Sequence, residues 1–296
     1  MRSKITAVLS SSSFPLPRSL PDNVLRCGRF KFALDRPLIM GVVNVTPDSF
    51  SDGGRFLEPA AAILHARRLM DEGADLIDLG AESSRPGAAA EVSAKEELRR
   101  LLPILKGLRE LPLSIDTVKP EVMCVALAEG ASMINDINAL RSPGAVAAVA
   151  AADAAVCLMH MQGSPGTMQQ RPSYDDVVAE VKAFLRERIE TVRAAGIALE
   201  RIVVDPGFGF GKTLEHNLEL LRHLRQFESL GVPLLAGWSR KSSLGMITGK
   251  PADDRLAASI AAALIAAQNG AAILRVHDVA ATRDALRVLA AVGTTR

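Results

Sequence analysis

Apolar residues fall into eight short runs along the chain, and each run ends at or next to a polar residue. Within a run the apolar residues are mostly continuous, which is typical of strands buried on both faces of a parallel sheet. The segments between the runs have helical spacing, as in Leu214, Leu218, Leu221 and Leu224. The pattern therefore predicts short buried strands that alternate with helices. The predicted strands are 37–44, 76–79, 113–115, 133–136, 155–160, 201–204, 234–237 and 272–276.

Eight such units predict an α/β fold, a single (β/α)8 TIM barrel with its active site at the C-terminal ends of the strands. An open doubly wound sheet usually has about six strands and fits the pattern less well. A length of 296 residues suits one such barrel. We assign residues 31–296 to the barrel and residues 1–30 to a flexible N-terminal extension, because one short apolar run followed by serines and prolines makes a poor signal peptide.

The sixth predicted strand has the most informative ending. It runs into Asp205, Pro206 and three alternating glycines, and Thr213 can then cap the next helix. Bare backbone at such a loop lets a flat ligand approach the main chain. The segment 207–213 also resembles a phosphate-binding P-loop, but it is one residue short between its glycines, so that interpretation is weak.

Polar residues follow the other predicted strands as well. The set is Asn44, Asp78, Asp116, Asn135, His160, Asp205, Lys241, Arg275 and His277. A single Asp or Asn after a strand is commonly a helix cap or a turn residue, and Asp78 and His160 are predicted to be structural. Turns and caps do not require Lys, Arg or His, so the whole set predicts a ligand site at the mouth of the barrel.

Charge and cysteine content restrict the class of protein. The chain has 35 basic and 33 acidic residues and a formal charge of +2, so it has no general field for nucleic acid or an anionic membrane. Cys27, Cys124 and Cys157 form no C-x-x-C pair, which predicts reduced thiols in a cytoplasmic protein. The Ala-rich segment 256–267 is shorter than the roughly 20 residues of a membrane span and is predicted to be a buried helix.

Several motifs at the predicted strand ends point to one family. They are the segments 41–54, 82–87, 114–117, 135–137, 158–163, 203–213, 239–241 and 275–278. With these motifs in this order, the sequence resembles the bacterial dihydropteroate synthases. Ser84 stands where that family usually has Thr, and Trp238 stands where it usually has a smaller residue.

The resemblance implies a reaction and its participants. p-Aminobenzoate would condense with 7,8-dihydropterin-6-ylmethyl diphosphate and release pyrophosphate, with Mg²⁺ as cofactor and a homodimer as the assembly. Three other interpretations remain open from the sequence. They are a Schiff-base aldolase that uses Lys241, a methyltetrahydrofolate-binding methyltransferase domain, and a non-catalytic pterin-binding paralogue.

The resemblance also implies roles for individual residues. Those expected to bind the pterin are Asp116, Asn135, Ile137, Met159, Asp205, Lys241 and Arg275, of which Asp116, Lys241 and Arg275 are also expected to be catalytic. Those expected at the diphosphate are Asn44, Ser84, Arg275 and His277, with Asn44 also at Mg²⁺. Those expected at p-aminobenzoate are Phe50, Arg85, Pro86, Phe210 and Ser239.

The chemistry of these side chains suits the implied ligands. The Asp205 carboxylate can accept both the 2-amino group and the ring N–H of a pterin. The Arg275 guanidinium can lie on the ring while its N–H groups reach a phosphate. If diphosphate leaves first, Asp116 can stabilise the resulting pterin-methyl cation. Ser239 is predicted to begin the seventh helix, whose N-terminal N–H groups would favour the benzoate carboxylate.

Overall fold

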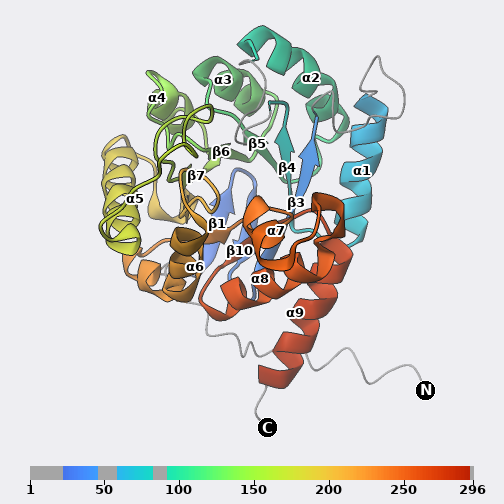
Figure 1. The fold of residues 1–296 in the computed structure, drawn as a ribbon. Coiled ribbons are helices and arrows are strands. Elements are labelled where there is room, and N and C mark those ends of the chain that lie inside the picture. Colours follow the sequence, from blue (N-terminus) through green and yellow to red (C-terminus); the bar gives the residue numbers. More distant parts are fainter. Residues whose placement is uncertain (1–22, 46–58, 83–91, 294–296) are drawn as a thin grey trace, which may run out of the picture.

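The computed structural model describes residues 23–45, 59–82 and 92–293. Its main sheet has eight parallel strands in the order β8-β7-β6-β5-β4-β3-β10-β9. A parallel bridge between Val204 and Leu234 joins the two ends of this order, so the sheet closes into a barrel. The predicted (β/α)8 fold is thus confirmed (Figure 1). The strands are β3 Leu38–Asn44, β4 Leu76–Gly80, β5 Leu113–Asp116, β6 Met133–Asp136, β7 Ala155–Met159, β8 Ile202–Asp205, β9 Leu235–Ala236 and β10 Ile273–Val276.

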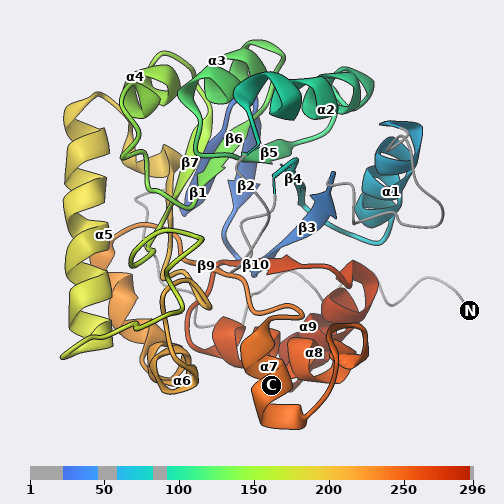
Figure 2. The same ribbon diagram turned by 45° about the horizontal axis from the view of Figure 1, so that its top comes forward.

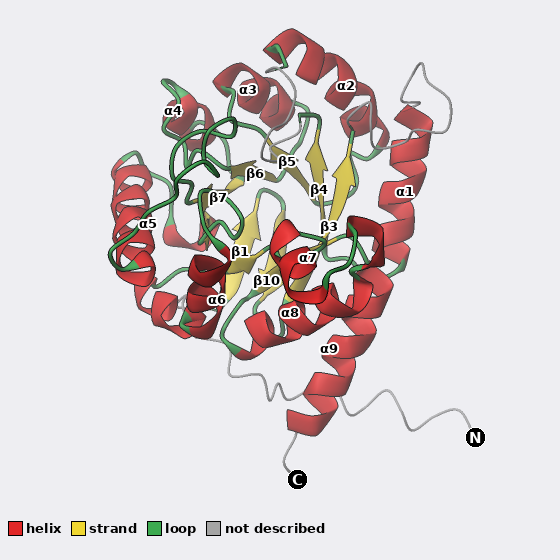
Figure 3. Cartoon of the chain, in the orientation of Figure 1, coloured by secondary structure: helices red, strands yellow, loops and turns green. Residues whose placement is uncertain are grey.

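Helices form the outer layer around the strands (Figures 2 and 3). They are α1 Pro59–Asp71, α2 Ala94–Gly107, α3 Pro120–Ala128, α4 Ala145–Ala150, α5 Val177–Ala194, α6 Leu214–Arg222, α7 Ser242–Thr248, α8 Leu256–Gln268 and α9 Val279–Gly293. Short 3-10 helices lie at Leu199–Arg201, Leu224–Leu230 and Ala252–Asp254. Among the residues that the structure describes, no helix is long and apolar enough to span a membrane.

Local signals explain where several helices begin. The Thr213 hydroxyl accepts a hydrogen bond from the backbone N–H of His216 at 3.2 Å, and the Thr213 N–H donates to His216 Nδ1. The predicted cap of α6 is therefore confirmed. Pro120 occupies the first turn of α3, where its missing N–H has no cost. The prediction that Ser239 begins the seventh helix is wrong, because α7 starts at Ser242 with Lys241 as its N-cap residue.

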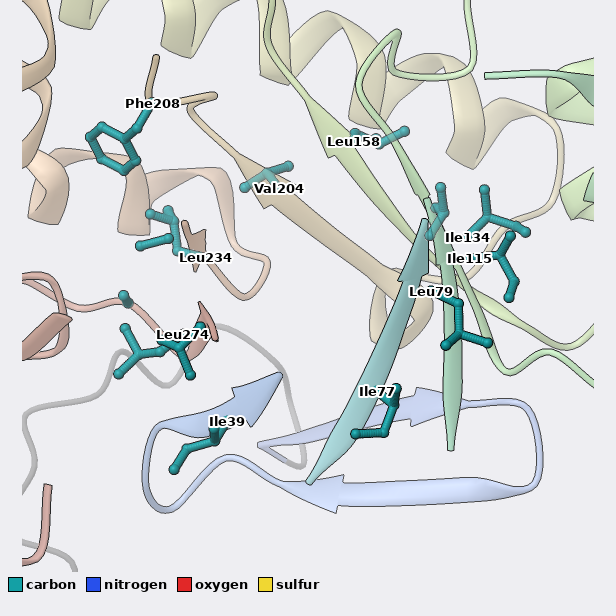
Figure 4. Packing of buried hydrophobic residues seen from close by; sticks show 14 of the residues in the cluster. Ile39, Ile77, Leu79, Ile115, Ile134, Leu158, Val204, Phe208, Leu234 and Leu274 are labelled. Carbon is teal, nitrogen blue, oxygen red and sulfur yellow. The ribbon is translucent and has the colours of Figure 1, made fainter. Parts of the chain in front are cut away.

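Alternate residues of each strand face the helices and the barrel interior. The outward-facing residues, such as Ile77, Leu79 and Ile115, form a large buried cluster with the inner faces of the helices (Figure 4). The interior residues near the N-terminal ends of the strands, such as Met40 and Leu76, belong to a separate buried cluster. This period of two decides which polar residues reach the mouth.

An antiparallel hairpin fills the N-terminal end of the barrel. It consists of β1 Val24–Cys27 and β2 Phe30–Ala33, paired from Val24 opposite Ala33 to Cys27 opposite Phe30. Leu25 and Cys27 are fully buried and pack in the same cluster as the interior residues of the strands. Residues 24–30 therefore belong to the folded barrel and not to the extension to which we assigned them. Each strand of the hairpin is only four residues long, so the sequence shows no clear apolar run there.

Candidate active site

Polar residues occupy the interior positions at the C-terminal ends of the strands. Leu76 lies in the interior apolar cluster, and Asp78 follows two positions later on the same face of β4. The same step of two leads from apolar interior residues to Asn135, Asp205 and Arg275 on β6, β8 and β10. The barrel thus brings together side chains that are up to 197 positions apart in the sequence.

Arg275 is the centre of this group. Its Nε donates to Asp78 Oδ2 at 2.7 Å, and its Nη2 donates to Asp116 Oδ2 at 3.0 Å. Asn135 Nδ2 also donates to Asp78 Oδ2, at 3.2 Å, while its Oδ1 is buried and accepts no hydrogen bond from the described residues. One guanidinium therefore holds two carboxylates, and the amide oxygen of Asn135 remains available to a ligand.

Asp78, which was predicted to be structural, lies inside the barrel in contact with two of the predicted site residues. It is fully buried and fixes both Arg275 and Asn135. Its position in the middle of a strand concealed this role, because Leu79 and Gly80 follow it before the loop begins. The step of two from Leu76 is the signal that could have identified it as facing the interior.

Burial perturbs the ionisable groups of the mouth. Removal from water raises the pKa of Asp116 to about 7; Arg275 opposes this rise, and Asp78 adds to it. Burial also raises the pKa of Asp205, while Lys241 counteracts that shift. It lowers the pKa of Lys241 to about 8, against the attraction of Asp205. Such perturbed groups, gathered in one place, are typical of active sites.

The loop after β8 is fixed by contacts to its backbone. The N–H of Gly207 donates to Asp205 Oδ1 at 2.7 Å, which orients the carboxylate. A Cβ on Gly207 would come within 1.9 Å of the His160 carbonyl oxygen, so only glycine fits there. Lys212, which is buried, donates from Nζ to the carbonyl oxygens of Gly207 and Phe210 at 3.0 Å each and contacts His160 Nδ1 at 2.9 Å.

This geometry assigns Lys212 and His160 to the framework of the site. Burial and the ammonium of Lys212 lower the pKa of His160 to about 2, so the imidazole is neutral and can accept a hydrogen bond. The prediction that His160 is structural agrees with this arrangement. Lys212 does not act as a P-loop lysine, because its three contacts tie the loop to the end of β7.

Lys241 enters the mouth between two glycines. A β-carbon added to Gly209 would lie 3.3 Å from Lys241 Cδ, and one added to Gly237 would lie 3.9 Å from Lys241 Nζ. The ammonium donates to the Phe208 carbonyl oxygen and lies 4.7 Å from the centre of the Phe210 ring. The side chain therefore reaches the same space as Arg275, whose Cβ is 3.8 Å from the added carbon at Gly237.

One wall of the mouth is apolar. Ile137, Met159, Met161 and Met168 form a buried cluster, against which Phe210 packs. Ile137 and Met159, two residues expected at the pterin, thus lie together with Phe210, which was expected at p-aminobenzoate. A flexible methionine-rich surface suits the face of a flat ring.

The remaining predicted residues divide into two groups. Ser239 Oγ lies 2.9 Å from His277 Nδ1, and it accepts the N–H of His277 at 3.2 Å. Asn44 Oδ1 and Asp116 Oδ2 each lie 3.8 Å from the position of a β-carbon added at Gly80. Both side chains therefore approach the C-terminal end of β4. The predicted residues Phe50, Ser84, Arg85 and Pro86 lie outside the described residues.

The donor set at Asn44 is compatible with Mg²⁺. Within the described ranges, no three His, Cys, Asp or Glu side chains are grouped to hold a metal ion. Mg²⁺ does not need such a group, because it keeps several waters and binds one or two protein oxygens together with substrate phosphates. The amide oxygen of Asn44, at the end of β3, provides an oxygen donor of this kind.

We expect kcat/KM to rise with pH through about 7, because the predicted role of Asp116, to stabilise positive charge, requires its ionised form in the free protein. It should fall again above about 8 as Lys241 loses its proton. The measurement is a pH profile of kcat/KM for the parent and for Asp116→Asn. An acid limb that is unchanged in Asp116→Asn would assign that limb to another group.

Comparison with known proteins identifies the class to which this barrel belongs. A family model described as pterin binding enzyme matches residues 40–277, which run from β3 to the end of β10. The fold and the mouth are therefore those of a pterin-binding barrel enzyme.

Relatives and solved structures define the family more narrowly. The dihydropteroate synthase of Escherichia coli strain K12 is 50% identical over 261 residues, which cover 87% of this chain and 92% of that protein. A structure of Xanthomonas albilineans dihydropteroate synthase with 4-aminobenzoic acid matches with a TM-score of 0.87 and 54% identity, covering 93% of this chain and 100% of that chain. Another structure of that enzyme, in complex with 7,8-dihydropteroate, gives a TM-score of 0.84 and 52% identity over 92% and 100% of the two chains. This chain belongs to the dihydropteroate synthases, which are transferases of a pterin-methyl group.

The sequence left three other functions open, and family membership and the site geometry bear on them differently. Membership of the dihydropteroate synthases, shown by the 50% identity to the Escherichia coli enzyme, excludes the Schiff-base aldolase and the methyltransferase domain. A paralogue without activity would be expected to lack part of the charged group, but Asp116, Lys241 and Arg275 are all present and meet at one mouth.

Proposed function

We propose that the mouth of this barrel joins p-aminobenzoate to 7,8-dihydropterin-6-ylmethyl diphosphate and releases 7,8-dihydropteroate and pyrophosphate. The observation that carries the proposal is the convergence of Asp205, Asn135, Lys241 and Arg275 on one interior space. The carboxylate and the amide match the polar edge of a pterin, and the two cations match its carbonyl oxygen and the diphosphate.

The pterin lies with its amino edge toward Asp205 and its ring on Arg275. Asp205 has one oxygen bound to the Gly207 N–H, and its carboxylate accepts the two adjacent N–H groups of the ring edge. Asn135 Oδ1, which is buried without a partner in the described residues, accepts a further N–H of the ring. Ile137 and Met159 cover the ring as its apolar wall.

Asp116 acts on the charge that develops during the reaction. Departure of the diphosphate before attack leaves positive charge spread over the pterin-methyl group and the ring nitrogens. The Asp116 carboxylate, held by Arg275 at 3.0 Å, is preorganised near that charge and need not move to stabilise it. The aryl amine of p-aminobenzoate then forms the C–N bond and loses a proton.

Asn44 and His277 receive the diphosphate together with Arg275 and Ser84. Bound Mg²⁺ would neutralise the leaving diphosphate, with Asn44 supplying a protein oxygen. His277 is oriented for this role by its contact with Ser239 Oγ. The leaving group is thus bound by residues at the ends of the neighbouring strands β3 and β10.

p-Aminobenzoate occupies the outer part of the mouth. Phe210, whose ring contacts the Lys241 ammonium, provides a surface for the benzoate ring. Ser239 donates to its carboxylate, with Phe50, Arg85 and Pro86 completing the site. The Xanthomonas albilineans enzyme was solved with 4-aminobenzoic acid, and it shares 54% of its residues with this chain over the matched length.

We expect Asp205→Asn to weaken pterin binding by roughly 10- to 100-fold, because an amide donor would face a ring donor in a buried pair at a cost of about 1–3 kcal/mol. Isothermal titration calorimetry with a 6-hydroxymethylpterin measures this loss. Asp175→Asn, on the exposed surface, is the matched control. Equal dissociation constants for the parent and Asp205→Asn would place the pterin elsewhere.

The assay that tests the proposed function measures both products in one sample. The chain, p-aminobenzoate, the pterin diphosphate and Mg²⁺ should give dihydropteroate and pyrophosphate in equal amounts. Omission of p-aminobenzoate or of Mg²⁺ should abolish dihydropteroate formation. Pterin binding without any product would instead indicate a non-catalytic pterin-binding protein.

The enzyme is a cytoplasmic homodimer in this proposal. Helices α7, α8 and α9 expose several large apolar side chains that a second copy could cover. They are Met246, Ile247, Leu256, Ile265, Val288 and Val292. The cytoplasmic location is supported by the free state of all three cysteines.

A further inference from the structure

A strained turn carries two residues of the site. The N–H of Lys241 donates to the Trp238 carbonyl oxygen at 3.2 Å, which closes a four-residue turn after β9. Arg240, the third residue of that turn, has φ = 58°. A turn with positive φ at its third residue normally has glycine or asparagine there, because a β-carbon is strained in that conformation. An arginine at this position indicates that contacts of its side chain offset the strain of the β-carbon.

The backbone on both sides of Arg240 is held by neighbouring elements. The Arg240 N–H donates to Ser259 Oγ on α8 at 3.0 Å. Arg255 Nη1 donates to the carbonyl oxygens of Arg240 and Lys241 at 3.0 and 3.2 Å. Helices α7 and α8 lie side by side in Figures 1 and 2, and the turn is anchored between them and β10.

The Arg240 side chain links this turn to the segment after β10. Its Nη2 donates to Asp278 Oδ1 at 2.7 Å, and its Nε donates to Asp278 Oδ2 at 3.2 Å. This two-bond pairing fixes orientation as well as distance. Asp278 directly follows His277 in the sequence, and Arg240 directly follows Ser239. His277 and Ser239 are also in contact, through Ser239 Oγ. The two strand ends are therefore joined by adjacent pairs.

We propose that Arg240 is a positioning residue, whose pairing with Asp278 holds the strained turn so that Ser239 and Lys241 keep their places at the mouth. This inference rests on the proposed roles of Ser239 and Lys241 toward the substrates. Lys241 follows the strained residue directly, so relaxation of φ at Arg240 would move the ammonium away from Gly237 and Arg275. The strain is maintained by an ion pair that contacts neither substrate.

The proposal predicts a contrast between two substitutions at one position. Arg240→Ala loses the ion pair but keeps the strained β-carbon, so the turn relaxes and kcat/KM falls by about 10- to 100-fold. Arg240→Gly also loses the pair, but glycine adopts this φ without strain, so kcat/KM stays within about threefold of the parent. Asp278→Ala should resemble Arg240→Ala in the parent background and should have little further effect in Arg240→Gly.

The experiment measures kcat/KM, thermal midpoint and the dissociation constant of 6-hydroxymethylpterin for these four variants, including the Arg240→Gly/Asp278→Ala double variant. Rescue by glycine in both kcat/KM and pterin affinity supports the proposal. Equal losses in Arg240→Ala and Arg240→Gly would overturn it and indicate direct substrate contact. Lower thermal midpoints with unchanged kcat/KM and affinity would also overturn it. Activity of the parent tests the proposed function separately, and the affinity ratios do not depend on turnover.

Discussion

Replacement of Asp116 by asparagine is expected to lower kcat by about 10²- to 10³-fold, because a fixed negative charge beside the developing cation would be lost. The substitution preserves an acceptor for the Arg275 Nη2–H at 3.0 Å, so the local packing should persist. Pterin binding should change much less than kcat, since the charge acts mainly on the transition state. Single-turnover release of pyrophosphate measures the step directly.

The comparison with Asp205→Asn makes this prediction specific. Both substitutions remove one carboxylate from the same mouth, but only Asp205 is assigned to the ground-state recognition of the pterin. Asp205→Asn should therefore chiefly raise the pterin dissociation constant, and Asp116→Asn should chiefly lower kcat. Pyrophosphate release in Asp116→Asn as fast as in the parent would remove Asp116 from the ionisation step.

Replacement of Arg275 by methionine should have the largest effect on stability. It leaves the fully buried Asp78 without its guanidinium and leaves Asp116 with no cation at 3.0 Å. Loss of one partner of a buried ion pair costs about 3–5 kcal/mol in the free energy of unfolding. Urea unfolding of the parent and Arg275→Met measures the difference.

A double variant separates charge from packing in this result. In Asp78→Asn/Arg275→Met the buried carboxylate is removed together with its partner, so part of the lost stability should return. If the double variant is as unstable as the sum of both single variants, the loss comes from packing and not from an unpaired carboxylate. Activity should be absent in both proteins, because neither retains the guanidinium at the pterin.

The sequence allowed most of the barrel and much of its mouth to be predicted. Continuous apolar runs defined the eight strands, and their polar ends supplied Asn44, Asp116, Asn135, Asp205 and Arg275. The strand predictions succeeded because a strand buried on both faces has a strong local signal.

Three features could not be obtained from local pattern. The hairpin from Val24 to Ala33 has short strands that pack against interior residues at the N-terminal end of the barrel. Its stability therefore comes from contacts distant in sequence. The step of two from Leu76 places Asp78 on the interior face, but its pairing with Arg275, 197 positions away, has no local signal. The strain at Arg240 depends on Asp278, 38 positions later, and no local preference predicts a left-handed arginine.

A crystal structure of the chain with bound 6-hydroxymethyl-7,8-dihydropterin would test the assignment of the mouth most directly. The expected result is a ring whose amino edge lies within hydrogen-bonding distance of the Asp205 carboxylate, with Asn135 at the same edge and the Arg275 guanidinium against the ring face. A pterin bound outside the barrel mouth, or with its amino edge turned away from Asp205, would contradict the assignment.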